Sequence, residues 1–275
     1  MEELFLFLDE LVKKTLLSSS EIDKTLWKIS QGFLKKFPID ENGKVDYNER
    51  SQLLIVEMSE RIEKELQKTG YKSLVSSVLT DFDLILSNNQ EIQKELTGIE
   101  FSKNLINNLN KEKQLVVNAT TAFLGSSGVN ANIIFPIQKT LIENASLGYS
   151  FNTFEKKLRE RIIGDEKLAG TVERYVGQVT RDSLYQYDGV INQSVAIEYG
   201  LNAFRYVGTV VGDTRPQCKK WLKQKLLKES ELGKEISWAK KNGSGMIPAT
   251  NKENFIVYRG GYNCRHRAIP ILIEE

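Results

Sequence analysis

The sequence predicts a mainly α N-terminal body followed by a small α+β C-terminal unit, in which short strands pack on a long helix. Over the first 200 residues, apolar side chains recur at the three- and four-residue spacing of amphipathic helices. After Gly200, β-branched and aromatic residues gather in short runs that are typical of strands. The charge balance changes at the same point, from 24 basic and 29 acidic residues before it to 14 basic and 7 acidic residues after it.

The composition is that of an ordinary globular protein, with 40% hydrophobic and 27% charged residues. No run approaches the roughly 18 apolar residues that a membrane helix needs, so we expect no contact with a membrane. The first residues are acidic and lack a small-residue cleavage site, so we expect no secretory signal and synthesis in a cytoplasm. Two cysteines in such a compartment are typical of thiols or metal ligands rather than of a disulfide framework.

Residues 1–150 are expected to form the helical body. Two helices are predicted over 2–17 and 18–37, with Ser20 as the N-cap of the second, followed by a tight loop with a turn at Asn42-Gly43. Helical spacing continues over segments 48–86, 105–125 and 133–150.

Residues 151–275 are expected to form the second domain. It begins with a short helix over 154–163 and a long amphipathic helix over 167–199. The candidates for the buried face of the long helix are Val172, Tyr175, Val176, Val179, Leu184, Val190, Ile191 and Val195.

The sheet unit is predicted over residues 200–275. Strands are expected over 204–211, 254–260 and 268–274, and Pro270 indicates that the last of them lies at an edge of the sheet. Two short helices are expected between the first two strands, one beginning near Pro216 and one over 229–241.

Cysteine and histidine side chains suggest a metal site in this unit. Cys218, Cys264 and His266 offer three soft or borderline ligands, and Asp213 offers a fourth, which is a donor set suited to zinc. Such a site would hold together a small domain whose own core is thin.

Three other interpretations of these residues stay open. Both cysteines can be small buried hydrophobic residues, with His266 hydrogen-bonded to a backbone carbonyl. They can also form a disulfide. A nucleophilic pair of Cys218 and His266 is the catalytic alternative, but no third group that would orient the histidine is identifiable, so we expect no enzyme and assign no catalytic residue.

Charged residues around the cysteines allow two further interpretations. Asp213 is placed to cap the helix that begins at Pro216, and Arg215 is placed to pair with Asp182 or Glu198 on the long helix. Several basic residues lie near the two cysteines in the sequence: Lys219, Lys220, Lys223, Arg265 and Arg267. They either form a solvated face or make weak contacts with the phosphates of a nucleic acid.

The order of these residues resembles a known family. A long helix leads to Gly208-Thr209, then to Asp213, Arg215-Pro216 and Cys218, and about 45 residues later to Asn263-Cys264-Arg265-His266. Over roughly residues 150–275 this order is similar to the phage head-morphogenesis family, the F-type minor head proteins named from phage Mu. Many members have His-Pro before the Asn-Cys pair, where this chain has Gly261-Tyr262, so this chain offers one metal ligand fewer.

The resemblance implies a minor head (capsid) protein that acts in head morphogenesis, is associated with the portal and takes part in DNA packaging or delivery. It implies a virion location in the capsid interior or at the portal vertex, with the host cytoplasm as the site of assembly. The expected partners are the portal or the major capsid protein, and packaged DNA would meet the basic C-terminal unit. The alternatives are an enzyme or toxin-type domain that uses Cys218 and His266, and a weak, non-specific DNA-binding module.

Overall fold

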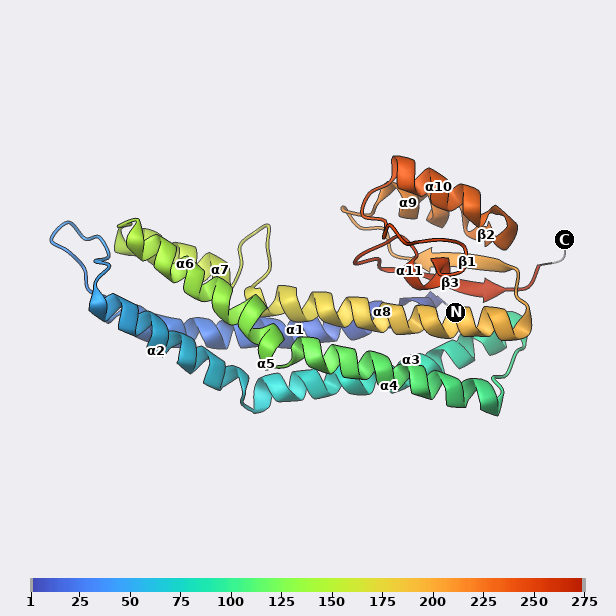
Figure 1. The fold of residues 1–275 in the computed structure, drawn as a ribbon, viewed down its shortest axis with the longest axis horizontal. Coiled ribbons are helices and arrows are strands. Elements are labelled where there is room, and N and C mark those ends of the chain that lie inside the picture. The colour runs from blue at the N-terminus through green and yellow to red at the C-terminus, as the bar shows by residue number, and fades with distance from the viewer. Residues whose placement is uncertain (1, 274–275) are drawn as a thin grey trace. The chain divides into compact units, whose positions relative to one another are not determined.

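The computed structural model describes residues 2–273 and is mainly helical, with one small antiparallel sheet among its C-terminal residues (Figure 1). This confirms the predicted mainly α body with a small α+β C-terminal unit. The helices of the first 170 residues are α1 (Glu2–Leu34), α2 (Glu49–Leu66), α3 (Thr69–Thr97), α4 (Lys103–Leu124), α5 (Ser126–Val129), the π-helix η1 (Asn130–Ile134), α6 (Phe135–Ser146) and α7 (Phe151–Ile162). The later elements are α8 (Thr171–Tyr199), β1 (Ala203–Gly208), α9 (Pro216–Gln224), β2 (Leu226–Lys228), the 3-10 helix η2 (Glu229–Glu231), α10 (Leu232–Asn242), α11 (Phe255–Tyr258) and β3 (His266–Ile271).

The described residues form two compact units, each built from separate stretches of chain. The helical unit contains residues 13–78 and 120–179. The sheet unit contains residues 2–12, 79–119 and 180–273. Both units therefore include residues from either side of residue 150.

The helical unit has a continuous apolar core. Most of the buried side chains come from α1, α2, α6 and α7, with others from α3, η1 and the start of α8. Phe37 and Phe154 pack with their ring centroids 5.1 Å apart. The loop predicted around Asn42-Gly43 is present: Ile39 and Val45 form an antiparallel bridge, and Gly43 has a φ of 73°, which glycine adopts without strain.

The sheet unit consists of the three strands in the order β2-β1-β3, all antiparallel, together with helices on both faces. Figure 1 shows the sheet between α8 on one side and α9 with α10 on the other. On the α9 side, Trp221 packs edge-on against Tyr206 of β1, at 5.4 Å between ring centroids, and against Phe255, at 5.2 Å. Pro270 lies in β3, an edge strand as predicted, where its missing N–H does not interrupt a second ladder.

Two predicted elements differ from the structure. The helices predicted over 2–17 and 18–37 are one helix, α1, so Ser20 lies inside a helix and is not an N-cap. The neighbouring Ser19 donates a hydrogen bond to the carbonyl oxygen of Thr15, four residues earlier in the same helix. The strand predicted over 254–260 is the short helix α11. Its apolar residues pack into the sheet unit without joining the sheet, so their β propensity was overridden by tertiary contacts.

Candidate metal centre

Three buried side chains from separate segments of the sheet unit meet at one point. Cys218 lies in the first turn of α9, Cys264 lies in the loop before β3, and His266 is the first residue of β3. Their ligand atoms all lie within 4.8 Å of one another, and Cys264 Sγ is 3.5 Å from His266 Nδ1. Since both cysteines are free thiols, the structure does not contain the disulfide that was one of the alternatives.

Local sequence explains how these side chains are positioned. Pro216 occupies the start of α9, as predicted, where its fixed φ favours the helix and its missing N–H costs nothing. Asn263 has a φ of 54°, which asparagine tolerates, and this turn leads directly into Cys264. His266 pairs with Gly208 across the β1–β3 ladder, so the strand pairing places the imidazole against the end of β1.

Gly260 leaves the space in which the two sulfurs meet. A Cβ atom at this position would lie 2.3 Å from Cys218 Sγ and 3.1 Å from Cys264 Sγ. A side chain here would therefore displace at least one of the two ligands. Gly260 was not among the predicted site residues, because a glycine carries no ligand atom and its closeness to the sulfurs depends on the fold.

The two thiols are close enough to shift each other's pKa in opposite directions. The hydrogen bond that Cys218 donates to Cys264 raises the pKa of Cys218, which burial raises further. The same hydrogen bond holds the pKa of Cys264 well below its usual value, and the neighbouring His266 lowers it as well. Because thiolate is the form that binds metals, this pair is prepared to bind a cation.

Tyr206 completes the buried surroundings of the sulfurs. Its hydroxyl oxygen lies 3.5 Å from Cys218 Sγ and 3.6 Å from Cys264 Sγ, and its ring stacks on His266 at 5.6 Å. Burial raises the pKa of Tyr206 well above its usual value, so the hydroxyl stays protonated and can donate to a thiolate. The cluster of two sulfurs and one imidazole can therefore hold a metal ion.

Asp213, the predicted fourth ligand, lies outside this three-residue cluster. It is exposed and lines the same cavity of about 210 Å³ as the cysteines and His266. The prediction that Asp213 caps α9 was wrong as well, because the N-cap residue is Arg215 and the cap has no side-chain hydrogen bond.

Arg215 holds the two cysteine-containing segments together through backbone contacts. Its guanidinium donates to the carbonyl oxygen of Gly260 at 2.8 Å and to that of Tyr262. The hydrogen bonds of the Arg215 side chain go to these carbonyl oxygens rather than to Asp182 or Glu198, the carboxylates predicted to pair with it. Asp182 accepts a hydrogen bond from the N–H of Asn263 at 3.1 Å, and burial raises the pKa of Asp182, although the positive charge of Arg215 is near enough to oppose that shift. Gln217, which was not a predicted site residue, also donates to Gly260 O, at 3.1 Å.

The predicted phosphate-contacting residues do not form one surface. Lys219 and Lys223 are exposed on α9, whereas Lys220 pairs with Glu235 at 2.6 Å and its ammonium lies 4.5 Å from the Trp238 ring centroid. Arg265 is half-buried and lines the cavity beside Cys264. Arg267 is 0% exposed and cannot contact a nucleic acid, so its assignment was wrong.

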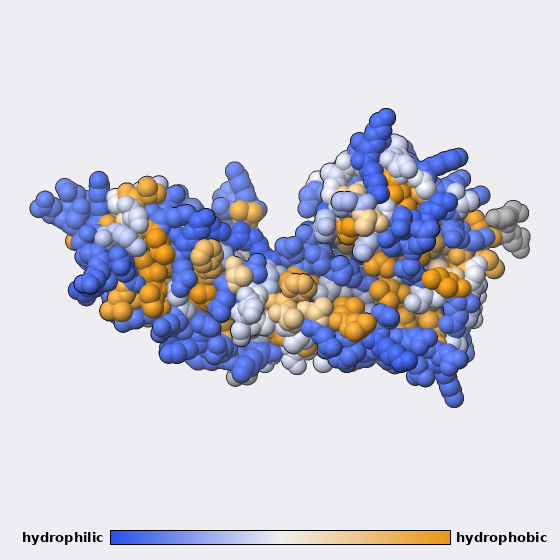
Figure 2. All heavy atoms as spheres, in the orientation of Figure 1, coloured by the Kyte–Doolittle hydropathy of each residue, from blue (hydrophilic) through white to orange (hydrophobic). Residues whose placement is uncertain are grey.

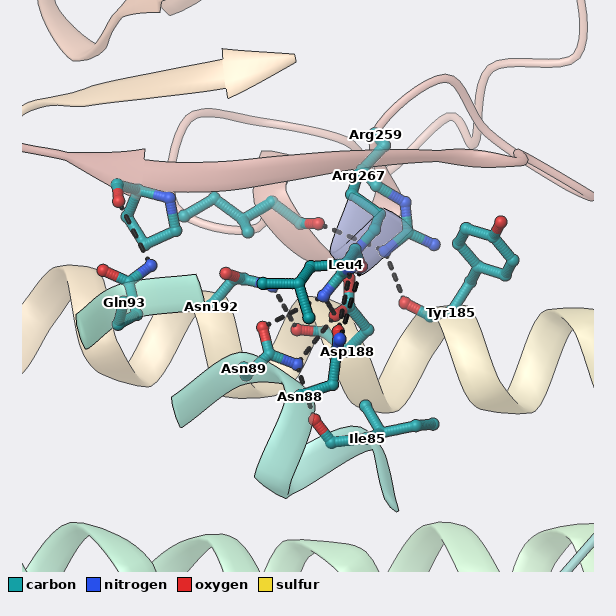
Figure 3. Close-up of polar contacts among 12 residues, drawn as sticks. Leu4, Ile85, Asn88, Asn89, Gln93, Tyr185, Asp188, Asn192, Arg259 and Arg267 are labelled. Atoms are coloured by element: carbon teal, nitrogen blue, oxygen red, sulfur yellow. Dashed lines mark hydrogen bonds and ion pairs between the residues drawn. The ribbon is translucent and has the colours of Figure 1, made fainter. Parts of the chain in front are cut away.

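Arg267 instead forms a buried ion pair with Asp188 of α8, shown in Figure 3. Its Nη2 and Nε lie 2.7 and 3.2 Å from the two carboxylate oxygens, a bidentate arrangement. Nη1 donates to the carbonyl oxygen of Leu4 at 2.9 Å, and the side-chain oxygens of Asn88 and Asn89 accept from the guanidinium as well. This network connects β3 to α8, α3 and the beginning of α1.

No protein-family model, curated protein or solved structure matches this chain. Among residues 2–273, no helix is long and apolar enough to cross a membrane.

Proposed function

We propose that this chain is a phage minor head protein whose sheet unit is held together by zinc. The supporting observation is that residues some 45 positions apart in the sequence, which form the motif of that family's pattern, line a single cavity. They are Asp213, Arg215, Cys218, Asn263, Cys264 and His266. The role proposed for them is structural, because the three metal-ligating side chains are buried and the surrounding hydrogen bonds join chain segments.

In this proposal, zinc binds the sulfurs of Cys218 and Cys264 and a ring nitrogen of His266. Its fourth ligand is water or the carboxylate of Asp213, which lines the same cavity. The metal would join the start of α9 to the start of β3, in addition to the hydrogen bonds from Arg215 and Gln217. It would stabilise a unit whose sheet has only three strands.

Elemental analysis of the full chain, purified without added metal, tests the zinc site. We expect one equivalent of zinc, protection of both thiols from alkylation, and loss of the metal in Cys264→Ser and His266→Gln. Asp213→Asn identifies the fourth ligand: zinc that binds about tenfold more weakly would assign the carboxylate, and unchanged binding would assign water. Metal-free protein with two slowly reacting thiols would show that the cluster is a packed chain end.

The helical unit offers a surface for a portal or capsid subunit. A groove of about 640 Å³ between α2 and the η1–α6 segment has Val56, Ile134 and Phe135 along it, with Glu60 and Glu63 among its polar residues. Val56 and Phe135 are 50% and 62% exposed, and Figure 2 shows hydrophobic side chains on the surface of this part of the molecule. Exposed apolar surface rimmed by charge is typical of a protein-binding site.

Co-purification with the portal protein of the phage that encodes the chain tests this role. We expect a stable complex that is lost in the double variant Val56→Glu with Phe135→Glu. Leu115→Glu is the matched control, because Leu115 is 63% exposed on α4 but does not line the groove. A complex that survives the groove substitutions, or the absence of the chain from purified virions by mass spectrometry, would contradict the proposal.

A further inference from the structure

The cavity next to the metal centre is lined by more positive than negative charge. Arg181, Arg215 and Arg265 all line it, and Asp213 is the single carboxylate among its lining residues. Arg215 already donates to two backbone carbonyls. Within residues 2–273, no hydrogen bond or ion pair is found for the guanidinium of Arg181 or of Arg265.

Arg181 and Arg265 are close enough to repel each other. Partial burial lowers the pKa of Arg181, and the positive charge of Arg265 lowers it further, while Asp182 and Asp9 act in the opposite direction. Two arginines that lack an internal acceptor and face the same cavity are a common arrangement for holding an anion. An anion between the two guanidinium groups would attract both of them and so offset their mutual repulsion.

His266 is a third residue of the cavity with hydrogen-bonding capacity that the fold does not use. His266 is 4% exposed and lines the cavity, and no described residue forms a hydrogen bond with its Nε2. Because Nδ1 is the nitrogen that lies near Cys264, Nε2 is the one that would carry the proton when Nδ1 binds a metal. A buried N–H without an acceptor costs free energy, and an anion in the cavity would supply the acceptor.

From these contacts we infer that the cavity lined by Arg181, Arg265 and His266 binds a phosphate group. A phosphate offers several charged acceptor oxygens to donors on different sides of a cavity, as these three residues require. This inference deepens the proposed function, because it assigns a ligand to the same cavity. The site differs from a basic surface because its donors are half-buried or buried. The phosphate can be free or can be the terminal phosphate of a nucleic acid.

The first test uses inorganic phosphate and the full chain with its metal, followed by NMR or calorimetry. We expect saturable binding that weakens about tenfold in Arg181→Gln and in Arg265→Gln, since each loses a charge-assisted hydrogen bond. Asp213→Asn should bind phosphate more tightly, because it removes the one negative charge among the lining residues. Lys219→Gln is the control, since Lys219 is exposed on α9 and does not line the cavity.

The second test identifies the source of the phosphate with two single-stranded oligonucleotides that differ only in a 5′-phosphate or a 5′-hydroxyl. Tighter binding of the phosphorylated strand, with the same dependence on Arg181 and Arg265, would assign a terminal nucleic-acid phosphate. Equal binding of the two strands, with phosphate binding intact, would assign free phosphate. Absence of saturable phosphate binding, or binding that is unchanged in both arginine variants, overturns the inference, while zinc content measured on the same samples reports separately on the metal centre.

Discussion

At the scale of single residues, burial decides what a charged side chain does. Arg267 lies in a basic segment with Arg265 and was predicted to contact phosphate, yet the two arginines have different roles. Arg265 lies in the loop before β3 and lines the cavity beside Cys264, whereas Arg267 lies inside β3, where residues 266 to 270 are all buried. The guanidinium of Arg267 meets the carboxylate of Asp188, with both side chains only 1% exposed.

Removing one member of this buried pair should be costly. We expect Asp188→Asn to lower the free energy of unfolding of the sheet unit by about 3 kcal/mol, because the guanidinium stays buried without its counter-charge. Lys94→Gln breaks an exposed ion pair with Glu100 and should change stability by less than about 1 kcal/mol. Chemical denaturation of both variants measures the difference, and equal effects would show that the Arg267–Asp188 pair contributes little.

A second residue-scale prediction concerns the space between the sulfurs. Gly260→Ala should lower zinc affinity at least about tenfold, because the added Cβ would overlap Cys218 Sγ. Gly212→Ala is the matched control, since a Cβ there meets nothing within 4 Å. Competition with a chromophoric chelator measures both affinities, and equal values would argue against a site formed by these two sulfurs.

At the scale of elements, the first turn of α8 depends on a carboxylate from another helix. Asp23 of α1 is 2% exposed and accepts hydrogen bonds from the N–H groups of Val172 and Glu173, at 2.8 and 3.0 Å. These N–H groups have no partner within α8 because they belong to its first turn. Asp23 therefore acts as an N-cap supplied from a distance of about 150 residues along the chain.

This contact should make stability depend on pH. Burial raises the pKa of Asp23 to about 7, although the two N–H donors oppose the shift. The folded state then binds the proton more tightly than the unfolded state, so this contribution to stability is complete below about pH 4 and is lost as the pH rises through about 7.

The variant Asp23→Asn isolates this effect, because it cannot ionise while every other group still titrates. We expect the unfolding free energy of the wild type, relative to the variant, to fall by roughly 2 kcal/mol between about pH 5 and pH 7. Urea denaturation across this range is the measurement. A constant difference would mean that Asp23 keeps an ordinary pKa in the folded protein.

At the scale of the whole molecule, the sheet unit is assembled from three stretches of chain. Its C-terminal part depends on residues far earlier in the sequence, since Arg267 donates to Leu4 O and Asn88 Oδ1, and Tyr187 packs on Phe82 at 5.7 Å. The Tyr187 hydroxyl also donates to the carbonyl oxygen of Leu109 at 3.3 Å.

The fragment 151–275, which the sequence suggests as a domain, should therefore not fold alone. It lacks residues 2–12 and 79–119, so Arg267 would lose acceptors and the apolar face of α8 would be uncovered. We expect poorly dispersed amide resonances, rapid proteolysis and no cooperative melting, in contrast to the full chain. A cooperative transition of the fragment with dispersed resonances would show that it is an autonomous domain.

The features that could be predicted from the sequence are those that depend on local spacing. The periodicity of α8 identified buried side chains such as Val172, Val176 and Leu184, and Pro216 and Pro270 marked a helix start and an edge strand. The sequence also singled out Cys218, Cys264 and His266 as ligands, although it did not establish that they meet. These successes share one reason: helix periodicity and proline constraints act over a few residues.

Which of the other polar residues share a site depends on tertiary packing. Asp213 is close in sequence to Cys218 but exposed, Arg267 is next to His266 but paired with Asp188, and Gly260 matters because two sulfurs lie against it. Each outcome depends on atoms brought from distant parts of the chain. A residue's own neighbours set its backbone conformation, whereas its burial and its partners are set by how the elements pack.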